Sequence, residues 1–187
     1  MGKEALQDFW RVCRTVSHEN RLKLLWILFE RGEQCVMDLE LASGLTKPNT
    51  SIQLKELFLA GLIRFRRQKM NVIYRAEADR RIPFAEILLD SLRQCFEEKM
   101  PFADIVRQVT AFTHERRVEI VQALLVGPCL AAQLEDRVGM KSSAVFRHLS
   151  KLETRMIVRR DGKLYRVACP SQPLSRTLLD IVKKETE

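Results

Sequence analysis

The chain has 187 residues, of which 46% are hydrophobic and 30% charged, and it contains only seven glycines and six prolines. These proportions exclude a disordered chain and argue against an all-β architecture, which would need many tight turns. The formal net charge of +8 favours an anionic partner, although an ordinary basic protein would have a similar charge.

Cysteine usage and apolar runs indicate the compartment. The five cysteines stand singly, without a Cys-x-x-Cys pair, which predicts reduced and buried thiols. No apolar run approaches the roughly 18 residues that would span a bilayer. We therefore expect a cytoplasmic protein without membrane contact.

An internal repeat is the most informative feature of the sequence. Three blocks align in order at offsets of 96, 95 and 91: residues 17–22 with 113–118, residues 42–45 with 137–140, and residues 74–75 with 165–166. The offset changes only where loops are expected, as it does in duplicated domains. The sequence therefore predicts two copies, at residues 1–99 and 100–187.

In the first copy, an amphipathic N-terminal helix precedes a second helix with Leu22, Leu25 and Leu28 on one face. Ser17 is its expected N-cap, and Gly32 its expected end. The later elements are expected in the order helix 36–42, glycine turn, helix 47–60, β-hairpin 62–67 with 72–76, and closing helix 83–97.

The second copy repeats this order, with Thr113 as the expected N-cap and Gly127-Pro128 as the expected end of its first long helix. The later elements are expected at helices 130–137 and 141–155, hairpin 157–160 with 163–167, and helix 174–184. Asp161-Gly162 is a strong signal for a two-residue hairpin turn. The predicted fold class is mainly α with small β-hairpin wings, as two tandem winged helix-turn-helix domains.

The short helix, glycine turn and next helix form a helix-turn-helix, whose second helix can enter the major groove of DNA. Its polar face carries side chains suited to bases and phosphates. The candidates are Thr46, Lys47, Asn49, Thr50 and Gln53 in the first copy, and Lys141, Ser142, Ser143, Arg147 and His148 in the second. One such helix could simply present a solvated face, but recurrence ahead of a basic hairpin favours DNA contact.

The hairpins carry a second set of basic candidates. They are Arg66, Arg67 and Lys69 in the first copy, and Arg159, Arg160 and Lys163 in the second. Basic wing tips can reach phosphates or the minor groove and supply the salt-dependent part of affinity. The same charges would protect an exposed edge strand from aggregation, and the two roles are compatible.

Residues 140–152, Met-Lys-Ser-Ser-Ala-Val-Phe-Arg-His-Leu-Ser-Lys-Leu, resemble the recognition helix of ArsR/SmtB-type winged-helix repressors. Residues 17–22 and 61–63 are also similar to that family. Residues 45–57 fit less closely, because Pro48-Asn49-Thr50 replaces the usual run of small residues, although proline is tolerable in a first helical turn. The resemblance implies a sequence-specific regulator of transcription that binds double-stranded DNA, with a repressor role.

Several members of that family sense metals through a Cys-x-Cys motif on the first helix of the helix-turn-helix. Here the segment is Cys35-Val36-Met37, and a thioether is a poor ligand for zinc or arsenite, so this site is predicted to be lost. The closing helices contain no histidine for the family's other metal site. A Cys13–Cys35 thiolate pair is a minor alternative to buried structural cysteines.

His18 and His114 stand at matching helix starts and are predicted to cap or pack rather than to bind a metal. No nucleophile with its base, phosphate loop or carboxylate pair is recognisable, so we expect neither an enzyme nor a bound cofactor. The sequence identifies no small-molecule effector.

The resemblance also implies dimerisation through the first and last helices. Two copies joined by a few residues would reproduce such a dimer within one chain, so we expect a monomeric pseudo-dimer and, from its unequal recognition helices, an asymmetric operator. A homodimer with four winged helices is the competing assembly. The alternative function is a protein-interaction module in which one or both copies, the first more readily, have lost DNA binding.

Overall fold

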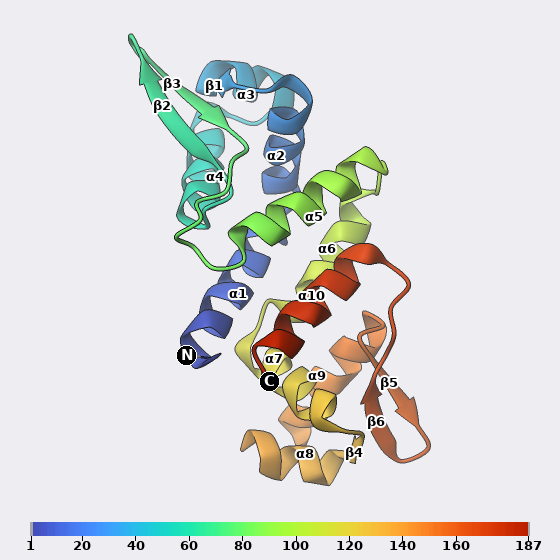
Figure 1. Cartoon of the computed structure of the whole chain (residues 1–187). Coiled ribbons are helices and arrows are strands. Elements are labelled where there is room, and N and C mark those ends of the chain that lie inside the picture. Colours follow the sequence, from blue (N-terminus) through green and yellow to red (C-terminus); the bar gives the residue numbers. More distant parts are fainter. Residues whose placement is uncertain (1, 187) are drawn as a thin grey trace. The chain divides into compact units, whose positions relative to one another are not determined.

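The computed structural model of the protein describes residues 2–186, with side chains from Gln7 onward. It is mainly helical with two small antiparallel sheets, which confirms the predicted fold class of tandem winged helix-turn-helix domains (Figure 1). Its contacts define two compact units. The first unit is Thr15–Val106, and the second combines the segment up to Arg14 with the chain from Arg107 onward. The predicted boundary between residues 99 and 100 separates the two sequence repeats, which differ from these contact units. That boundary stays a prediction.

From the first long helix of each copy onward, both units contain the same succession of helix, short strand, two helices, hairpin and closing helix. The first unit contains α2 (Glu19–Arg31), β1 (Gln34–Cys35), α3 (Val36–Ser43), α4 (Lys47–Leu59), β2 (Arg64–Gln68), β3 (Asn71–Arg75) and α5 (Ala85–Glu97). The second contains most of α1 (Gly2–Val16), then η1 (Thr110–Phe112), α7 (Glu115–Val126), β4 (Cys129–Leu130), α8 (Ala131–Val138), α9 (Ser142–Thr154), β5 (Val158–Asp161), β6 (Leu164–Val167) and α10 (Pro173–Lys184). Helix α6 (Phe102–Val109) crosses the boundary between the units.

Each helix-turn-helix is organised around a glycine in a left-handed conformation. Gly44 ends α3 with φ 68°, and Gly139 ends α8 with φ 60°, a region that side chains with a Cβ rarely adopt. The recognition helices α4 and α9 follow within a few residues. The predicted glycine turns are therefore confirmed in both copies.

The core of each unit is the apolar face that the periodicity predicts. In the first unit, Leu22, Leu25 and Leu28 of α2 are buried with Leu54 and Leu57 of α4. The corresponding buried residues of the second unit are Val118, Val121, Leu124, Leu149 and Leu152. In the second unit α1 adds Phe9, whose ring lies 5.8 Å from that of Phe112 between centroids. These buried faces hold the recognition helices in place.

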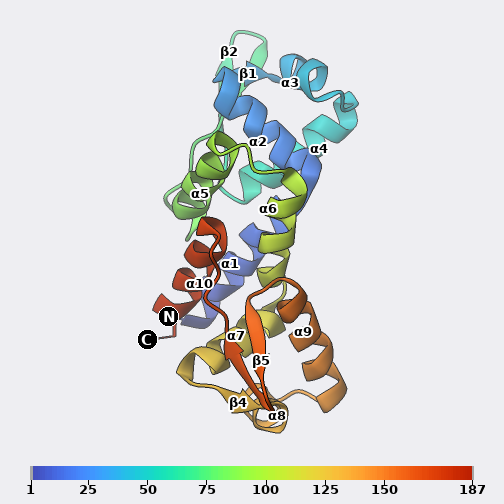
Figure 2. The same ribbon diagram turned by 90° about the vertical axis from the view of Figure 1, so that its right-hand side faces the viewer.

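The wings are three-stranded antiparallel sheets with strand orders β1-β3-β2 and β4-β6-β5. Phe65 pairs with Tyr74 in the first wing, and Arg160 pairs with Tyr165 in the second. Each hairpin stands beside its recognition helix (Figures 1 and 2). The two-residue strands β1 and β4, which the sequence did not indicate, pair with β3 and β6 and join each hairpin to the start of its helix-turn-helix.

Two local predictions were wrong. The N-caps are His18 and His114 instead of Ser17 and Thr113, because the chain is still extended at the histidines and the helices begin at the following glutamates. The second hairpin turn is Gly162-Lys163 instead of Asp161-Gly162, because Asp161 still pairs with Leu164. Gly162, at φ 61°, supplies the positive dihedral angle that the tight turn requires.

Candidate nucleic-acid interface

The exposed start of α9 gathers several predicted DNA contacts. Lys141 is the N-cap, and the side chains of Ser142 and Ser143 in the first turn are exposed. Arg147 lies one turn further along and is also exposed. Sequence reasoning omitted Lys151, which follows Arg147 by four residues and is exposed as well, so the i, i+4 spacing could have identified it.

The start of α4 presents fewer side chains suited to DNA. Thr46 is the N-cap and Lys47 the first helical residue, and both are exposed. Pro48 lies in the first turn, where its missing N–H removes no helical hydrogen bond. Asn49 is half-buried, and its Oδ1 accepts a hydrogen bond of 2.9 Å from Nε2 of Gln53, whose Oε1 in turn accepts one of 3.4 Å from Arg21.

Thr50 does not belong to a DNA-contacting surface, which corrects the prediction from the sequence. Its side chain is fully buried, and its hydroxyl donates a hydrogen bond of 3.1 Å to the backbone oxygen of Thr46. The residue at the aligned position of α9, Val145, is also fully buried. Thr50 therefore occupies a core position in the recognition helix.

His148 is the second correction, because it is only 5% exposed. Its ring packs against that of His114, with 4.9 Å between the centroids, and its Nδ1 has no hydrogen-bond partner within the part of the chain that the structure describes. Desolvation, aided by electrostatic repulsion from His114 and then from Arg117, lowers the pKa of His148 to about 4. A neutral, buried imidazole fixes α9 against the start of α7 and cannot reach DNA bases.

His114 performs a capping role that the sequence predicted as one of two possibilities. Its Nδ1 accepts a hydrogen bond of 3.1 Å from the backbone N–H of Arg116 in the first turn of α7. That nitrogen must be unprotonated to accept the bond. Desolvation, with a smaller effect from Arg117, lowers the pKa of His114 below its usual range, which favours this neutral state.

In the first wing, most arginines are bound to carboxylates. Nη2 of Arg66 lies 2.7 Å from Glu33, which is also 3.7 Å from Arg75. Its hydrogen bond to Arg66 lowers the pKa of Glu33, so the carboxylate is ionised at neutral pH. Arg67 and the turn residue Lys69 are exposed and form no ion pair among the described residues.

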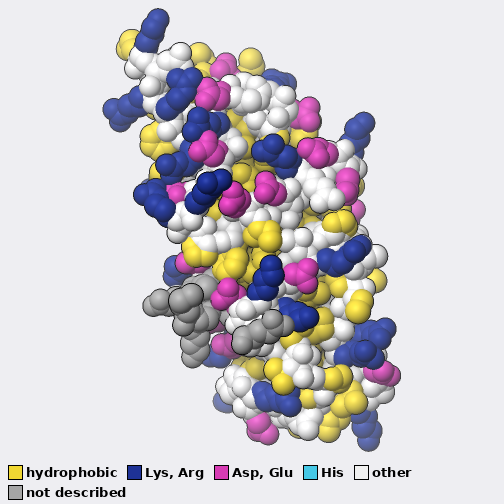
Figure 3. All heavy atoms as spheres, viewed as in Figure 1, with side chains coloured by type: hydrophobic (Ala, Val, Ile, Leu, Met, Phe, Trp, Pro, Cys, Tyr) yellow, Lys and Arg dark blue, Asp and Glu magenta, His cyan; other side chains and the backbone are white. Residues whose placement is uncertain are grey.

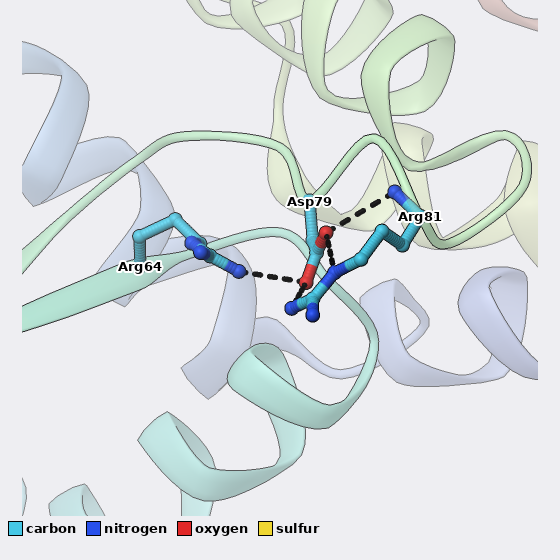
Figure 4. Close-up of polar contacts among 3 residues, drawn as sticks. All are labelled: Arg64, Asp79 and Arg81. Atoms are coloured by element: carbon cyan, nitrogen blue, oxygen red, sulfur yellow. Dashed lines mark hydrogen bonds and ion pairs between the residues drawn. The ribbon is translucent and has the colours of Figure 1, made fainter.

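A second cluster lies at the base of the same wing, where the chain returns from β3 (Figure 4). Asp79 receives Nη1 of Arg64 and Nη2 of Arg81, each at 2.7 Å. Its backbone N–H donates to the oxygen of Gly61 at 2.8 Å. The hydrogen bonds from Arg81 hold the pKa of Asp79 far below its usual range. The cluster fixes β2 and the segment after β3 to the end of α4.

The second wing leaves its basic side chains less compensated. Arg159 and Lys163 are exposed and form no ion pair among the described residues. Arg160 donates from Nε to the backbone oxygen of Gly162 at 2.9 Å, which leaves its charge uncompensated. The one carboxylate on this wing, Asp161, lies 3.7 Å from Arg166.

The thiols give no indication of a metal centre. No group of three or more His, Cys, Asp or Glu that could hold a metal ion occurs among the described residues. Cys13 is buried, and desolvation raises its pKa well above the usual range, which disfavours the thiolate that a metal needs. Cys95 and Cys129 are also buried, whereas Cys35 is half-buried and Cys169 is exposed, and these two depart from the prediction of buried thiols.

The two helix-turn-helix motifs, each followed by a wing of the same topology, define the winged helix-turn-helix class of DNA-binding protein. The family of bacterial regulatory proteins named arsR matches the chain twice, at residues 18–64 and 114–159. The chain therefore belongs to the arsR family and carries its helix-turn-helix domain twice. It is a DNA-binding regulator of transcription. Within residues 2–186, no helix is long and apolar enough to cross a membrane.

Proposed function

We propose that the protein is a transcriptional repressor that binds an asymmetric site in double-stranded DNA and reads it mainly through α9. The difference between aligned positions of the two recognition helices carries this proposal. Arg147 of α9 aligns with Ile52 of α4, and Lys141 aligns with Thr46. An exposed arginine can pair bidentately with guanine, whereas an isoleucine offers only apolar contact.

Phosphate contacts complete the proposed footprint. The exposed N-terminal turn of α9 presents Lys141, Ser142 and Ser143 to the DNA backbone, with the positive end of the helix dipole behind them. The basic residues of the second wing, Arg159, Arg160 and Lys163, extend this footprint. In the first unit the corresponding contacts come from Thr46, Lys47, Arg67 and Lys69. No metal or cofactor takes part.

One chain supplies both DNA-binding units in this proposal, so the functional particle is a monomeric pseudo-dimer. The duplication supports it, because the family domain is present twice in one chain. Light scattering is expected to give a mass near 21.8 kDa. A stable particle of twice that mass would make the protein a homodimer with four winged helices.

Selection of bound duplexes from a random pool tests the proposed function. The expected motif is asymmetric, and R147A should weaken binding to it by about ten- to a hundredfold, as the loss of one bidentate base contact does. I52A changes the aligned residue of α4 and is the matched control, with little expected effect. Undetectable affinity for any duplex at low salt would contradict the proposal.

A second function for the first unit, contact with a protein instead of DNA, is favoured by its exposed apolar side chains. Met37 and Leu41 of α3 are 72% and 87% exposed, and Ile52 of α4 is 58% exposed. Aligned positions in the second unit carry Ala132, Asp136 and Arg147. A selected motif that responds to substitutions in α9 and to none in α4 would favour this role.

A further inference from the structure

One face of the first wing carries three arginines, and each is bound to a carboxylate. The register places Arg64 opposite Arg75 and Arg66 opposite Ile73, so the three guanidinium groups project from the same side of the hairpin. Arg64 is bound by Asp79 and Arg66 by Glu33, each at 2.7 Å. Around this wing, acidic side chains lie among the basic ones (Figure 3).

Glu33 lies outside the hairpin, in the short connection between α2 and β1. Both of its oxygens accept hydrogen bonds from Arg66 of β2, at 2.7 and 3.3 Å. One of them also lies 3.7 Å from Arg75 of β3, which forms a closer ion pair with Glu77. The connection is held by the side chain of Gln34, which donates to the backbone oxygens of Arg31 at 3.2 Å and Glu33 at 2.7 Å. The carboxylate is therefore placed where a phosphate bound by both arginines would lie.

The second unit lacks this carboxylate. Gly32 and Gly127 both end the helix that precedes the first strand of a wing, so Glu33 aligns with Pro128. Proline brings no charge to the second wing, where Arg159 forms no ion pair among the described residues. The register places Asp161 at the position of Arg66, so the arginine that Glu33 binds in the first wing has no counterpart in the second.

We propose that Glu33 is an internal competitor for DNA phosphate on the first wing, so that Arg66 contributes little to the affinity of the intact protein. This inference rests on the proposed function and assigns the phosphate footprint unequally to the two wings. An exposed ion pair contributes little to stability, so the role of Glu33 lies in DNA binding rather than in folding.

The strength of the competition can be estimated from counterion release. Each phosphate neutralised on duplex DNA steepens the dependence of log K on log salt concentration by about 0.9. Removal of the Glu33 charge frees Arg66, whereas Arg75 keeps its ion pair with Glu77, so this slope should steepen by about one. At low salt, each added contact should strengthen binding by roughly three- to tenfold.

Substitution E33Q tests the inference, because glutamine keeps the shape of the side chain and removes its charge. E97Q is the matched control, since Glu97 is an exposed carboxylate at the end of α5 and the charge change is identical. Affinity for a random-sequence duplex is measured by fluorescence anisotropy across a salt series. We expect E33Q to bind more tightly with a steeper slope, E97Q to resemble wild type, and E33Q/R66A to lose most of the gain.

Two outcomes would overturn the inference. If E33Q has the affinity and slope of wild type, Glu33 does not compete with phosphate. If E33Q binds more weakly, Glu33 orients Arg66 toward DNA and has the opposite role. In both cases wild type still binds DNA. If the proposed function itself were wrong, neither wild type nor E33Q would bind duplex DNA at low salt, so the two failures can be distinguished.

Discussion

Acidification is expected to destabilise the second unit through His148. The titratable or charged groups that face its buried ring are His114, Arg117, Arg147 and Lys151. Desolvation is the main reason that its pKa falls from 6.5 to about 4. Because this folded-state pKa lies below the unfolded value, the unfolded chain binds the proton first as the pH drops. The stabilising contribution is complete above pH 6.5 and is lost progressively toward pH 4.

The magnitude follows from the pKa of His148, which moves from 6.5 to about 4. One pKa unit corresponds to about 1.4 kcal/mol, so the whole shift represents about 3 kcal/mol. Between pH 8 and pH 5 the free energy of unfolding should fall by about 2 kcal/mol because of this residue. A loss of that size is a substantial part of the stability of a small domain.

Tryptophan fluorescence can report on the relevant unit alone. The chain has two tryptophans, Trp10 in the second unit and Trp26 in the first, so W26F leaves only the reporter of the second unit. Urea unfolding of W26F and W26F/H148Q is compared at pH 8 and pH 5, with glutamine chosen because Gln53 occupies the aligned position of α4. We expect the histidine protein to lose about 2 kcal/mol more than the glutamine variant. Equal losses in the two proteins would show that His148 does not cause the acid destabilisation.

Two further substitutions test positions in the first unit. G61A should cost roughly 1–3 kcal/mol of unfolding free energy in a thermal or urea melt, because Gly61 has φ +70° and a Cβ there would lie 2.8 Å from Cδ1 of Ile82. G127A is its control, since a Cβ at Gly127 meets nothing within 4 Å, and similar losses in both variants would contradict the steric reason. T50V should leave DNA affinity unchanged and alter stability by less than about 1 kcal/mol, because the buried hydroxyl satisfies only a local bond. If T50V binds duplex DNA more weakly than wild type in a titration, Thr50 contributes to the DNA interface.

The succession of elements could be predicted because it depends on local signals. Apolar spacing identified the long helices, and the glycines that end α3 and α8 identified the turns. The strands β1 and β4 could not be predicted, because two residues show no alternation and gain their structure only by pairing with a distant strand.

The recognition helices show where a polar pattern misleads. Thr50 precedes Leu54 by four residues and Leu57 by seven, which is the spacing of the buried face, so its place in the core could have been inferred. His148 was assigned to the DNA surface because it is polar, yet it adjoins Leu149 on the buried side of α9. Residue type alone does not decide which face of an amphipathic helix a side chain occupies.

Contacts between residues far apart in the sequence account for the features of the site that could not be predicted. Glu33 and Arg66 are 33 residues apart, and only the folded wing brings them within 2.7 Å. The sequence therefore counted Arg66 among the available basic residues. The charge of Arg66 is present, but its guanidinium is already bound by the carboxylate of Glu33. No local sequence pattern could have paired these two residues.

A buried arginine shows what the two copies still share. Arg21 and Arg117 align and are 8% and 6% exposed. Arg117 donates from Nε to the backbone oxygen of Ala111 at 2.9 Å, and Arg21 donates in the same way to Thr15, which aligns with Ala111. Arg21 lies in α2 and Arg117 in α7, and each arginine ties its helix to the segment that precedes it. The same internal bond is therefore present in both units. The aligned surface positions, such as those of Glu33 and Arg147, differ. The shared residues support the scaffold, and the differing ones lie on the surface that the proposed function assigns to DNA, so this pattern supports the proposal of an asymmetric site.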